Sequence, residues 1–294
     1  MTPGSLHPAA LAWVAIFGAV LGSFLNVVIA RVPAGQSVVR PRSRCPRCVA
    51  PIAWYDNLPV VSWILLRARC RRCRAPISFR YPLVEVVGAG IAVAALLRHG
   101  FSPAAASELA FVLLLVALAF IDLDTWLLPH ALTWPLIGFG LAASVAGLSA
   151  AGSWRSAAIG AGLGFAAFAA ISWAGEKLLR REALGFGDVW LLSGLGAWLG
   201  ARALLPVVLL ASIQGSAVGI ALLLAWRAQP GPPAKAGASA ADLSAPRVEE
   251  PTEEPWTPPR NSVPFGPFLV AGALEWLYLS GRIAALVPAL DVFR

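Results

Sequence analysis

The chain has 294 residues and a net charge of +8; 58% of the residues are hydrophobic and only 13% are charged. A soluble protein of this composition would be covered in apolar surface, so the composition argues against a soluble globular protein and indicates a polytopic membrane protein in a lipid bilayer. Eleven arginines but only one acid, Asp56, fall between Arg31 and Arg80. Such a basic block can indicate nucleic-acid binding, but among many apolar segments a basic cytoplasmic loop explains it better, and we expect no nucleic acid as partner.

The first apolar segment, Pro8 to Val32, is long enough to cross a bilayer, and no small-residue cleavage site follows it. We therefore predict a retained first transmembrane helix over residues 1–32. The basic block behind it places its C-terminal end in the cytoplasm. Asn26 lies within this span and needs a hydrogen-bond partner there, so it is a candidate for either helix packing or function.

Four cysteines in the basic block form two C-x2-C pairs separated by 21 residues. Two such pairs supply four thiolates for a tetrahedral site, which is typical of structural zinc. A pair of disulfides is the alternative, and it fits poorly with a reducing cytoplasmic loop. We predict a small cytoplasmic zinc domain over residues 33–81 that depends on the metal because it has little core of its own. Its predicted Zn²⁺ ligands are Cys45, Cys48, Cys70 and Cys73.

The second predicted span, Pro82 to Leu97, carries Glu85 near its cytoplasmic end. Glu85 is either an interfacial or substrate-handling carboxylate or a solvated acid that complements the helix dipole. The further predicted spans cover 104–121, 132–148 and 157–179, one that begins at 187–188, one that ends at 226–227, and 265–279. We therefore expect an all-α polytopic membrane protein with about eight transmembrane helices.

The expected domain order follows from these spans. A transmembrane catalytic core covers 82–227, and residues 263–294 form the last transmembrane helix and a short apolar tail. Residues 228–262 contain eight prolines and an acidic run. Because such a composition cannot bury a core, we predict a disordered cytoplasmic linker there.

Three acids stand where apolar segments meet loops, and eight spans with both termini outside place Asp122, Asp124 and Asp188 at one membrane face. Gly185 and Gly187 precede Asp188 and permit an unwound helix start that can hold an extended peptide. Two carboxylates that share one proton can hydrolyse a peptide bond, because one activates water while the other polarises the carbonyl. Helix capping explains the spacing equally well, and a proton-coupled transporter is a third possibility.

A series of short motifs covers almost the whole chain in one order. They are Gly22-Ser23-Phe24-Leu25-Asn26-Val27, the two C-x2-C pairs, Trp54-Tyr55-Asp56-Asn57-Leu58-Pro59, Arg80-Tyr81-Pro82-Leu83-Val84-Glu85, Ile121-Asp122-Leu123-Asp124 with Leu128-Pro129, Leu132-Thr133-Trp134-Pro135, Gly185-Phe186-Gly187-Asp188, Gly196-Ala197-Trp198-Leu199-Gly200 and Pro264-Phe265-Gly266-Pro267-Phe268. In this order they resemble the bacterial prepilin peptidases, which are intramembrane aspartic proteases with a Gly-x-Gly-Asp motif.

The resemblance implies a multi-pass peptidase of the bacterial inner membrane that cleaves, at the cytoplasmic face and after a glycine, the basic leader of type IV prepilins or type II secretion pseudopilins. It implies Asp122 and Asp188 as the catalytic pair, since the family aspartate stands seven residues before the proline, here Pro129. Asp124 is then a helper. Many members also methylate the new N-terminus with S-adenosyl-L-methionine, and the cysteine domain is a hallmark of these bifunctional members. No glycine-rich nucleotide motif locates the methyl donor.

The chain departs from the family pattern at two positions. Trp190 stands where a lysine often follows the Gly-x-Gly-Asp aspartate, and His130 stands where an acid often follows Leu-Pro. Three alternatives remain beside the bifunctional enzyme: a peptidase without methylation, a proton-coupled membrane transporter that uses the two aspartates, and a zinc-bearing assembly factor of the secretion machinery with an inactive site. The sequence does not indicate an oligomeric state.

Overall fold

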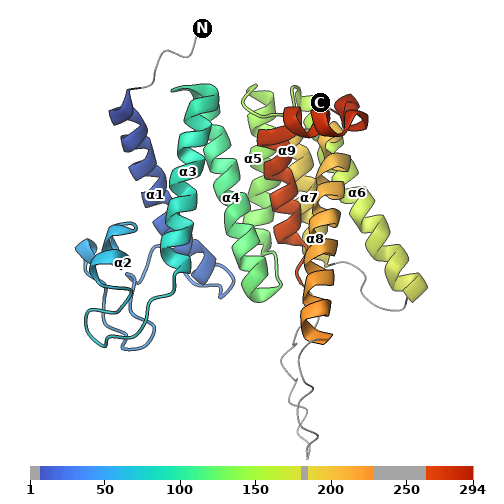
Figure 1. Cartoon of the computed structure of the whole chain (residues 1–294). Coiled ribbons are helices and arrows are strands. Elements are labelled where there is room, and N and C mark those ends of the chain that lie inside the picture. The colour runs from blue at the N-terminus through green and yellow to red at the C-terminus, as the bar shows by residue number, and fades with distance from the viewer. Residues whose placement is uncertain (1–6, 180–184, 228–262, 294) are drawn as a thin grey trace, which may run out of the picture.

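The computed structural model describes residues 7–179, 185–227 and 263–293, and no β-strand occurs among them. The long helices stand side by side in one bundle (Figure 1), with a small loop-rich domain, residues 33–79, at one end of it. They are α1 (Pro8–Arg31), α3 (Arg80–His99), α4 (Pro103–Thr125), α5 (His130–Val145), α6 (Trp154–Leu179), α7 (Phe186–Leu199), α8 (Leu204–Arg227) and α9 (Gly266–Leu286). The short segments are η1 (Trp54–Asn57), α2 (Val61–Leu65), η2 (Ala201–Ala203) and η4 (Pro288–Phe293).

Six of the helices are long and apolar enough to cross a membrane: α1, α3, α4, α6, α8 and α9. The all-α, multi-pass fold class predicted from the sequence is thus confirmed. Helices occur at all eight predicted positions, but α5 has 16 residues and α7 only 14. At 1.5 Å per residue both are shorter than the roughly 30 Å hydrocarbon core of a bilayer.

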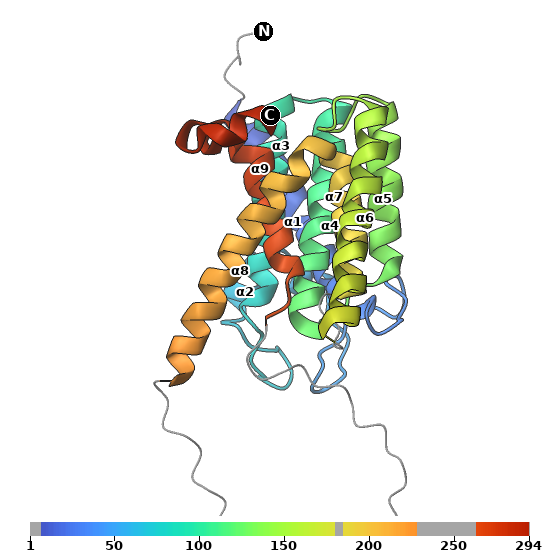
Figure 2. The same ribbon diagram turned by 90° about the vertical axis from the view of Figure 1, so that its right-hand side faces the viewer.

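The short helix α7 is the most enclosed part of the bundle. Nearly every residue from Asp188 to Leu199 is buried, and α7 packs against both α5 and α6, which lie close to it in Figure 2. A helix that is apolar on all sides belongs in a core rather than at a surface. The sequence alone predicted a full span here, because hydropathy does not distinguish a lipid-facing helix from one enclosed by other helices.

Two helix ends differ from the prediction. Helix α9 continues through Gly281 to Leu286, beyond the expected end at 279, because the next proline after Pro267 is Pro288. Residues 288–293 of the predicted tail form a 3-10 segment. Helix α5 ends at Val145, just before Gly147, which has a φ of 70°. The predicted linker over 228–262 lies outside the described residues.

Glycines allow the closest helix contacts. A Cβ on Gly160 of α6 would overlap the carbonyl oxygen of Gly196 on α7, and a Cβ on Gly196 would overlap that of Gly160. A Cβ on Gly18 of α1 would lie 2.5 Å from the carbonyl oxygen of Gly88 on α3. Small residues are used in this way at helix interfaces in membranes. The two contacts fix α7 against α6 and α3 against α1.

An aromatic stack joins the helices that carry the acidic residues. The Trp198 ring of α7 is stacked on Phe111 of α4, with centroids 4.3 Å apart, and on Phe139 of α5, with centroids 5.6 Å apart. Stacked aromatic pairs contribute about 0.5–1.5 kcal/mol beyond their burial. The stack therefore helps to hold α4 and α7 at a fixed separation.

Candidate active site and metal centre

Asp122 lies in the last turn of α4 and its side chain is buried. The helix ends three residues later, where Trp126 adopts the left-handed conformation and donates its backbone N–H to the carbonyl oxygen of Asp122. Oδ2 of Asp122 accepts a hydrogen bond of 3.1 Å from the backbone N–H of Gly266, at the start of α9. A residue 144 positions along the chain thus orients this carboxylate.

Asp188 lies in the first turn of α7 and is also buried. Its backbone N–H donates to the carbonyl oxygen of Gly185, the N-cap residue of the helix. A Cβ on Gly187 would lie 2.8 Å from Cβ of Leu128, so a glycine there lets the start of α7 pack against the α4–α5 loop. The predicted unwound start is therefore short: Gly185 precedes the helix and Gly187 is inside it.

The two carboxylates meet at Gly266. A Cβ placed on Gly266 would lie 2.5 Å from Oδ2 of Asp122 and 3.5 Å from Oδ1 of Asp188. Both carboxylates therefore lie against Gly266, although they come from different helices. The end of α4 and the start of α7 lie at the end of the bundle that carries the loop-rich domain (Figure 1).

Gly266 is a site residue that the sequence analysis did not select. Its contribution is a backbone N–H in the first turn of α9, where helical N–H groups have no partner within the helix and can donate elsewhere. The only sequence signal was the Pro264–Phe268 motif at the start of the last span. That signal supported the resemblance but did not suggest a contact with Asp122.

Asp124 points to a different partner from Asp122. Its carboxylate forms an ion pair with Nη1 of Arg80, which lies 2.6 Å from Oδ1, and the Arg80 guanidinium lies over the Phe120 ring. This pair joins the end of α4 to the start of α3. The structure thus separates the two neighbouring acids: Asp122 faces Asp188, and Asp124 faces α3.

Glu85 and Asn26 form ties between elements. Oε2 of the buried Glu85 accepts a 2.7 Å hydrogen bond from the backbone N–H of Val60 in the loop-rich domain. The Asn26 amide donates to the carbonyl oxygen of Tyr81 at 3.1 Å, which links α1 to α3. The hydrogen bonds of these two residues therefore go to the domain junction and not to the aspartates.

The two departures from the prepilin peptidase pattern contact each other. The His130 ring of α5 is stacked on Trp134, with centroids 5.3 Å apart, and meets the edge of Trp190 on α7 at 5.9 Å. Phe165 and Phe186 complete an aromatic cluster around Trp190. Since Trp190 is two residues from Asp188, this cluster packs the first turn of α7 against α5 and α6.

The four cysteines form the only group of metal-ligating side chains found among the described residues, and their Sγ atoms all lie within 4.8 Å of one another. None of them is in a disulfide. Sγ of Cys45 lies 3.8 Å from Sγ of Cys73. Four sulfurs arranged tetrahedrally at a Zn–S distance of about 2.3 Å are about 3.8 Å apart, so this spacing suits a zinc ion.

The two cysteine turns have the same construction. The N–H of Cys45 bonds to the carbonyl of Ala50, and the N–H of Cys70 bonds to that of Ala75. The backbone N–H groups of Cys48 and Arg47 lower the pKa of Cys45 to about 6. Those of Cys73 and Arg72 likewise lower the pKa of Cys70. Both turns therefore stabilise a thiolate, the form that binds metal.

Cys73 differs from these two thiols. The backbone N–H of Ala75 lowers its pKa, but burial and the three neighbouring sulfurs outweigh this effect and raise the pKa to about 11. Four thiolates repel one another when no cation lies between them, and a dication removes that cost. The residues of this cluster therefore fit a divalent metal.

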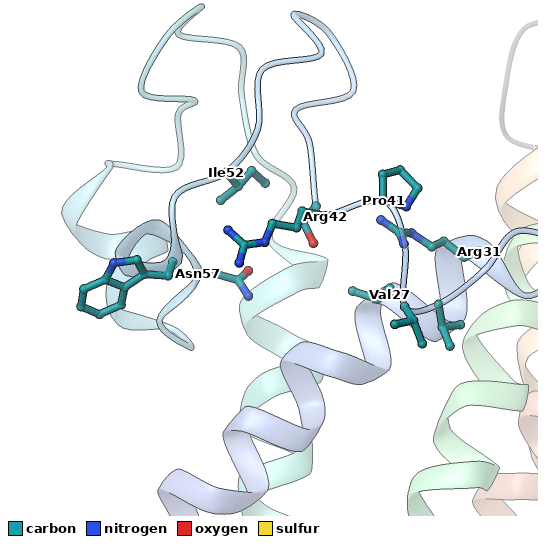
Figure 3. Close-up of a pocket in the computed structure, with 10 residues that line it drawn as sticks. Val27, Arg31, Pro41, Arg42, Ile52 and Asn57 are labelled. Carbon is teal, nitrogen blue, oxygen red and sulfur yellow. The ribbon is translucent and has the colours of Figure 1, made fainter.

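A separate cavity of about 520 Å³ lies between the end of α1 and the loop-rich domain (Figure 3). Arg31 and Arg42 contribute its charge and Trp54 an aromatic wall. Neither aspartate lines it. With two cations and no acid in its lining, this cavity suits an anionic group and lies outside the acidic pair.

Comparison with known proteins gives two family matches. Residues 16–99 match the bacterial peptidase A24 N-terminal domain, and residues 109–220 match the type IV leader peptidase family. No solved structure matches the chain.

Curated relatives extend this similarity over nearly the whole chain. A prepilin leader peptidase/N-methyltransferase of Myxococcus xanthus (strain DK1622) is 44% identical over 98% of this chain and 95% of that protein. A protein of the same name from Burkholderia pseudomallei (strain 1026b) is 37% identical over 91% of this chain and 85% of that protein. Another from Aeromonas hydrophila is 41% identical over 71% of this chain and 80% of that protein.

Proposed function

Since the chain belongs to the type IV leader peptidase family, we propose that Asp122 and Asp188 are the catalytic pair with which it cleaves prepilin leaders. It is an enzyme with peptidase and methyltransferase activity, and the transporter reading is disfavoured. The observation that supports this pair is that both carboxylates, from different helices, lie against Gly266. Helix capping alone gives no reason for two caps to lie against one residue.

The proposed reaction uses one proton held between the two carboxylates. The ionised carboxylate takes a proton from water, whose oxygen attacks the carbonyl carbon of the scissile peptide. The protonated partner donates its proton to the carbonyl oxygen. The tetrahedral intermediate then collapses, the C–N bond breaks and the leaving amine takes a proton from the pair. The N–H of Gly266 orients Asp122 throughout.

We propose a prepilin or type II secretion pseudopilin as substrate, cleaved after a glycine at the cytoplasmic face of the bacterial inner membrane. The acidic pair lies at the end of the bundle that carries the loop-rich domain. This domain is rich in arginine, and arginine-rich loops favour the cytoplasmic side. An extended peptide can approach at Gly185, which precedes α7 and carries no side chain.

Two bound groups belong to this proposal. Zn²⁺ is held by Cys45, Cys48, Cys70 and Cys73 and has a structural role, because all four ligand positions are protein sulfurs. S-Adenosyl-L-methionine supplies an electrophilic methyl group for the new N-terminal amine.

The test is to incubate the purified protein in lipid nanodiscs with a prepilin and to read the mass of the product's N-terminus, which reports scission and methylation together. Asp122→Asn and Asp188→Asn should each reduce the cleavage rate by about 10³-fold or more, because a lost partner leaves no shared proton. Asp124→Asn is the matched control. It removes an acid from the same turn of α4, but the contact that is lost is the ion pair with Arg80 and not a contact of the acidic pair. Cleavage at the wild-type rate by either Asn variant of the pair would remove that residue from the mechanism.

A further inference from the structure

The five-residue helix α2 has the reverse of the polarity expected in a water-soluble domain. Val61, Ile64 and Leu65 are exposed, with Ile64 at 60% and Leu65 at 75%. Their spacing of three and four residues places them on one helix face. The single polar side chain, Ser62, is buried; its Oγ accepts the N–H of Leu58 and donates to the carbonyl of Tyr55. An outward apolar face with an inward serine suits an apolar surrounding.

The position of α2 supports such a surrounding. In Figure 1, α2 lies beside the bundle, level with the last turn of α1 and the first turn of α3. Much of the rest of the loop-rich domain projects past the bundle end. Helices α1 and α3 both have the length and composition of membrane spans. Their ends mark the edge of the hydrocarbon region, so α2 lies at that edge.

The apolar face of α2 also adjoins a lipid-facing stripe. Trp63 meets the Phe79 ring edge-on, with centroids 5.8 Å apart, and its indole N–H donates to the carbonyl of Ile77. Phe79 is exposed directly before α3, and Leu83 and Val86 continue the exposed apolar row along α3. Because α3 spans the membrane, this row faces acyl chains, and α2 extends it sideways.

The charges around α2 complement a phospholipid surface. Arg67, Arg69 and Arg72 follow the helix within a few residues and are exposed. An element with aliphatic side chains on one side and arginines beside it is typical of helices that lie in the interface of anionic membranes.

The depth of α2 is set by α3. Val60, directly before α2, has a φ of 60°, a conformation that is an outlier for a β-branched residue. Its N–H donates at 2.7 Å to the buried carboxylate of Glu85 on α3. Glu85 therefore holds the turn that presents α2 at this height.

From these observations we propose that α2 is an interfacial helix whose face of Val61, Ile64 and Leu65 contacts the acyl chains of the leaflet on the side of the loop-rich domain. The occupant of this face is phospholipid rather than a second copy of the chain. The helix thereby anchors the loop-rich domain to the bilayer surface next to the ends of α1 and α3.

Photocrosslinking tests this proposal in the full-length protein. The photoreactive residue p-benzoylphenylalanine is introduced at Ile64, and in a second variant at Leu65, and each protein is irradiated in nanodiscs of phosphatidylethanolamine and phosphatidylglycerol. The matched control carries the probe at Val49, which is also 60% exposed but belongs to the first cysteine turn. Intact mass spectrometry then measures covalent phospholipid adducts.

The expected result is a phospholipid adduct at Ile64 and Leu65 and several-fold less at Val49. Adduct yields at both α2 positions no higher than at Val49 would overturn the proposal. A crosslinked dimer in place of lipid adducts would also overturn it and would show that a second copy covers α2. Two probe positions keep the test decisive if one variant fails to fold, as judged by its elution in size-exclusion chromatography.

Discussion

Gly266 has no room for a methyl group, because a Cβ would lie 2.5 Å from Oδ2 of Asp122. Gly266→Ala keeps the backbone N–H that orients Asp122 but pushes the carboxylate away from Asp188. A displacement of about 1 Å at a reacting centre can cost about 10²-fold in rate. We expect a loss of kcat of this order with little change in KM, measured from initial rates of prepilin cleavage.

Gly138→Ala is the control for this prediction. Gly138 is also a helical glycine, but a Cβ there meets nothing within 4 Å. The alanine should leave the cleavage rate unchanged. If Gly266→Ala also cleaves at the wild-type rate, the contact between Gly266 and Asp122 has no part in catalysis.

At the residue scale, the sequence indicated candidate site residues through their side chains but not through their backbone groups. Asp122 and Asp188 could be selected because acids at span ends are costly and therefore informative; their catalytic role stays a prediction. Gly266 could not, because every non-proline residue has an N–H group and only the fold shows where it points. The partner of Asp124 was equally hidden, since Arg80 is 44 residues away in the chain.

At the scale of helices, the crossing of α6 and α7 depends on Gly160 and Gly196. Gly160→Ala places a methyl group against the backbone of α7, which cannot rotate away as a side chain can. The helices must separate, and overpacking of this kind costs about 1–3 kcal/mol. We expect a lower Tm of the purified protein and a lower cleavage rate, because α7 carries Asp188.

Gly162→Ala provides the comparison within the same helix. Gly162 lies two residues further along α6, and a Cβ there meets nothing within 4 Å. The Tm of the Gly162→Ala protein should stay the same or rise slightly, since alanine has a higher helix propensity than glycine. Equal Tm values for the Gly160→Ala protein and the wild type would show that α6 and α7 adjust without cost.

Helix positions followed from the apolar segments, but helix lengths and surroundings did not. The two spans predicted between 187 and 227 occur as α7 and α8, separated by a turn in which Gly200 has a φ of 83° and η2 follows. The short, enclosed α7 was not foreseen, because its Leu-rich sequence would suit lipid as well as a protein core. The inverted polarity of α2 was also invisible, since only the fold shows that Ser62 points inward.

The whole molecule consists of a membrane bundle with side-chain hydrogen bonds between elements at both ends. At the end near the acidic pair, Glu85 accepts a hydrogen bond from the N–H of Val60, and Asn26 donates one to the carbonyl of Tyr81. At the other end, the buried Glu108 of α4 forms an ion pair with Arg98 of α3 at 2.6 Å. Its carboxylate also lies 2.9 Å from Nε2 of His99 on α3. The bundle therefore has its own fixed contacts, whereas the cysteine domain is joined to it by few.

The cysteine domain should consequently lose its structure without its metal while the bundle persists. Among residues 33–79, the buried side chains are only Cys45, Ala50, Ser62 and Ala75, and no large aliphatic residue is among them. A domain with so little core takes most of its folding free energy from the metal, about 10–16 kcal/mol for comparable zinc sites. Cys45→Ser should therefore reduce bound zinc from about one ion per chain to near zero. Limited proteolysis should then cut within 33–79 while the fragment from α3 to α8 stays intact.

Arg47→Ser is the matched control for this metal loss. Arg47 lies between the two ligands of the first turn, and its backbone N–H toward Cys45 is kept in the variant. The Arg47→Ser protein should bind zinc and resist protease as the wild type does. Chelation of the wild-type metal should reproduce the Cys45→Ser pattern, because both remove the same centre. A wild-type protein without metal, or a Cys45→Ser protein as resistant as the wild type, would show that this domain is held together by its contacts with α3 and the membrane instead.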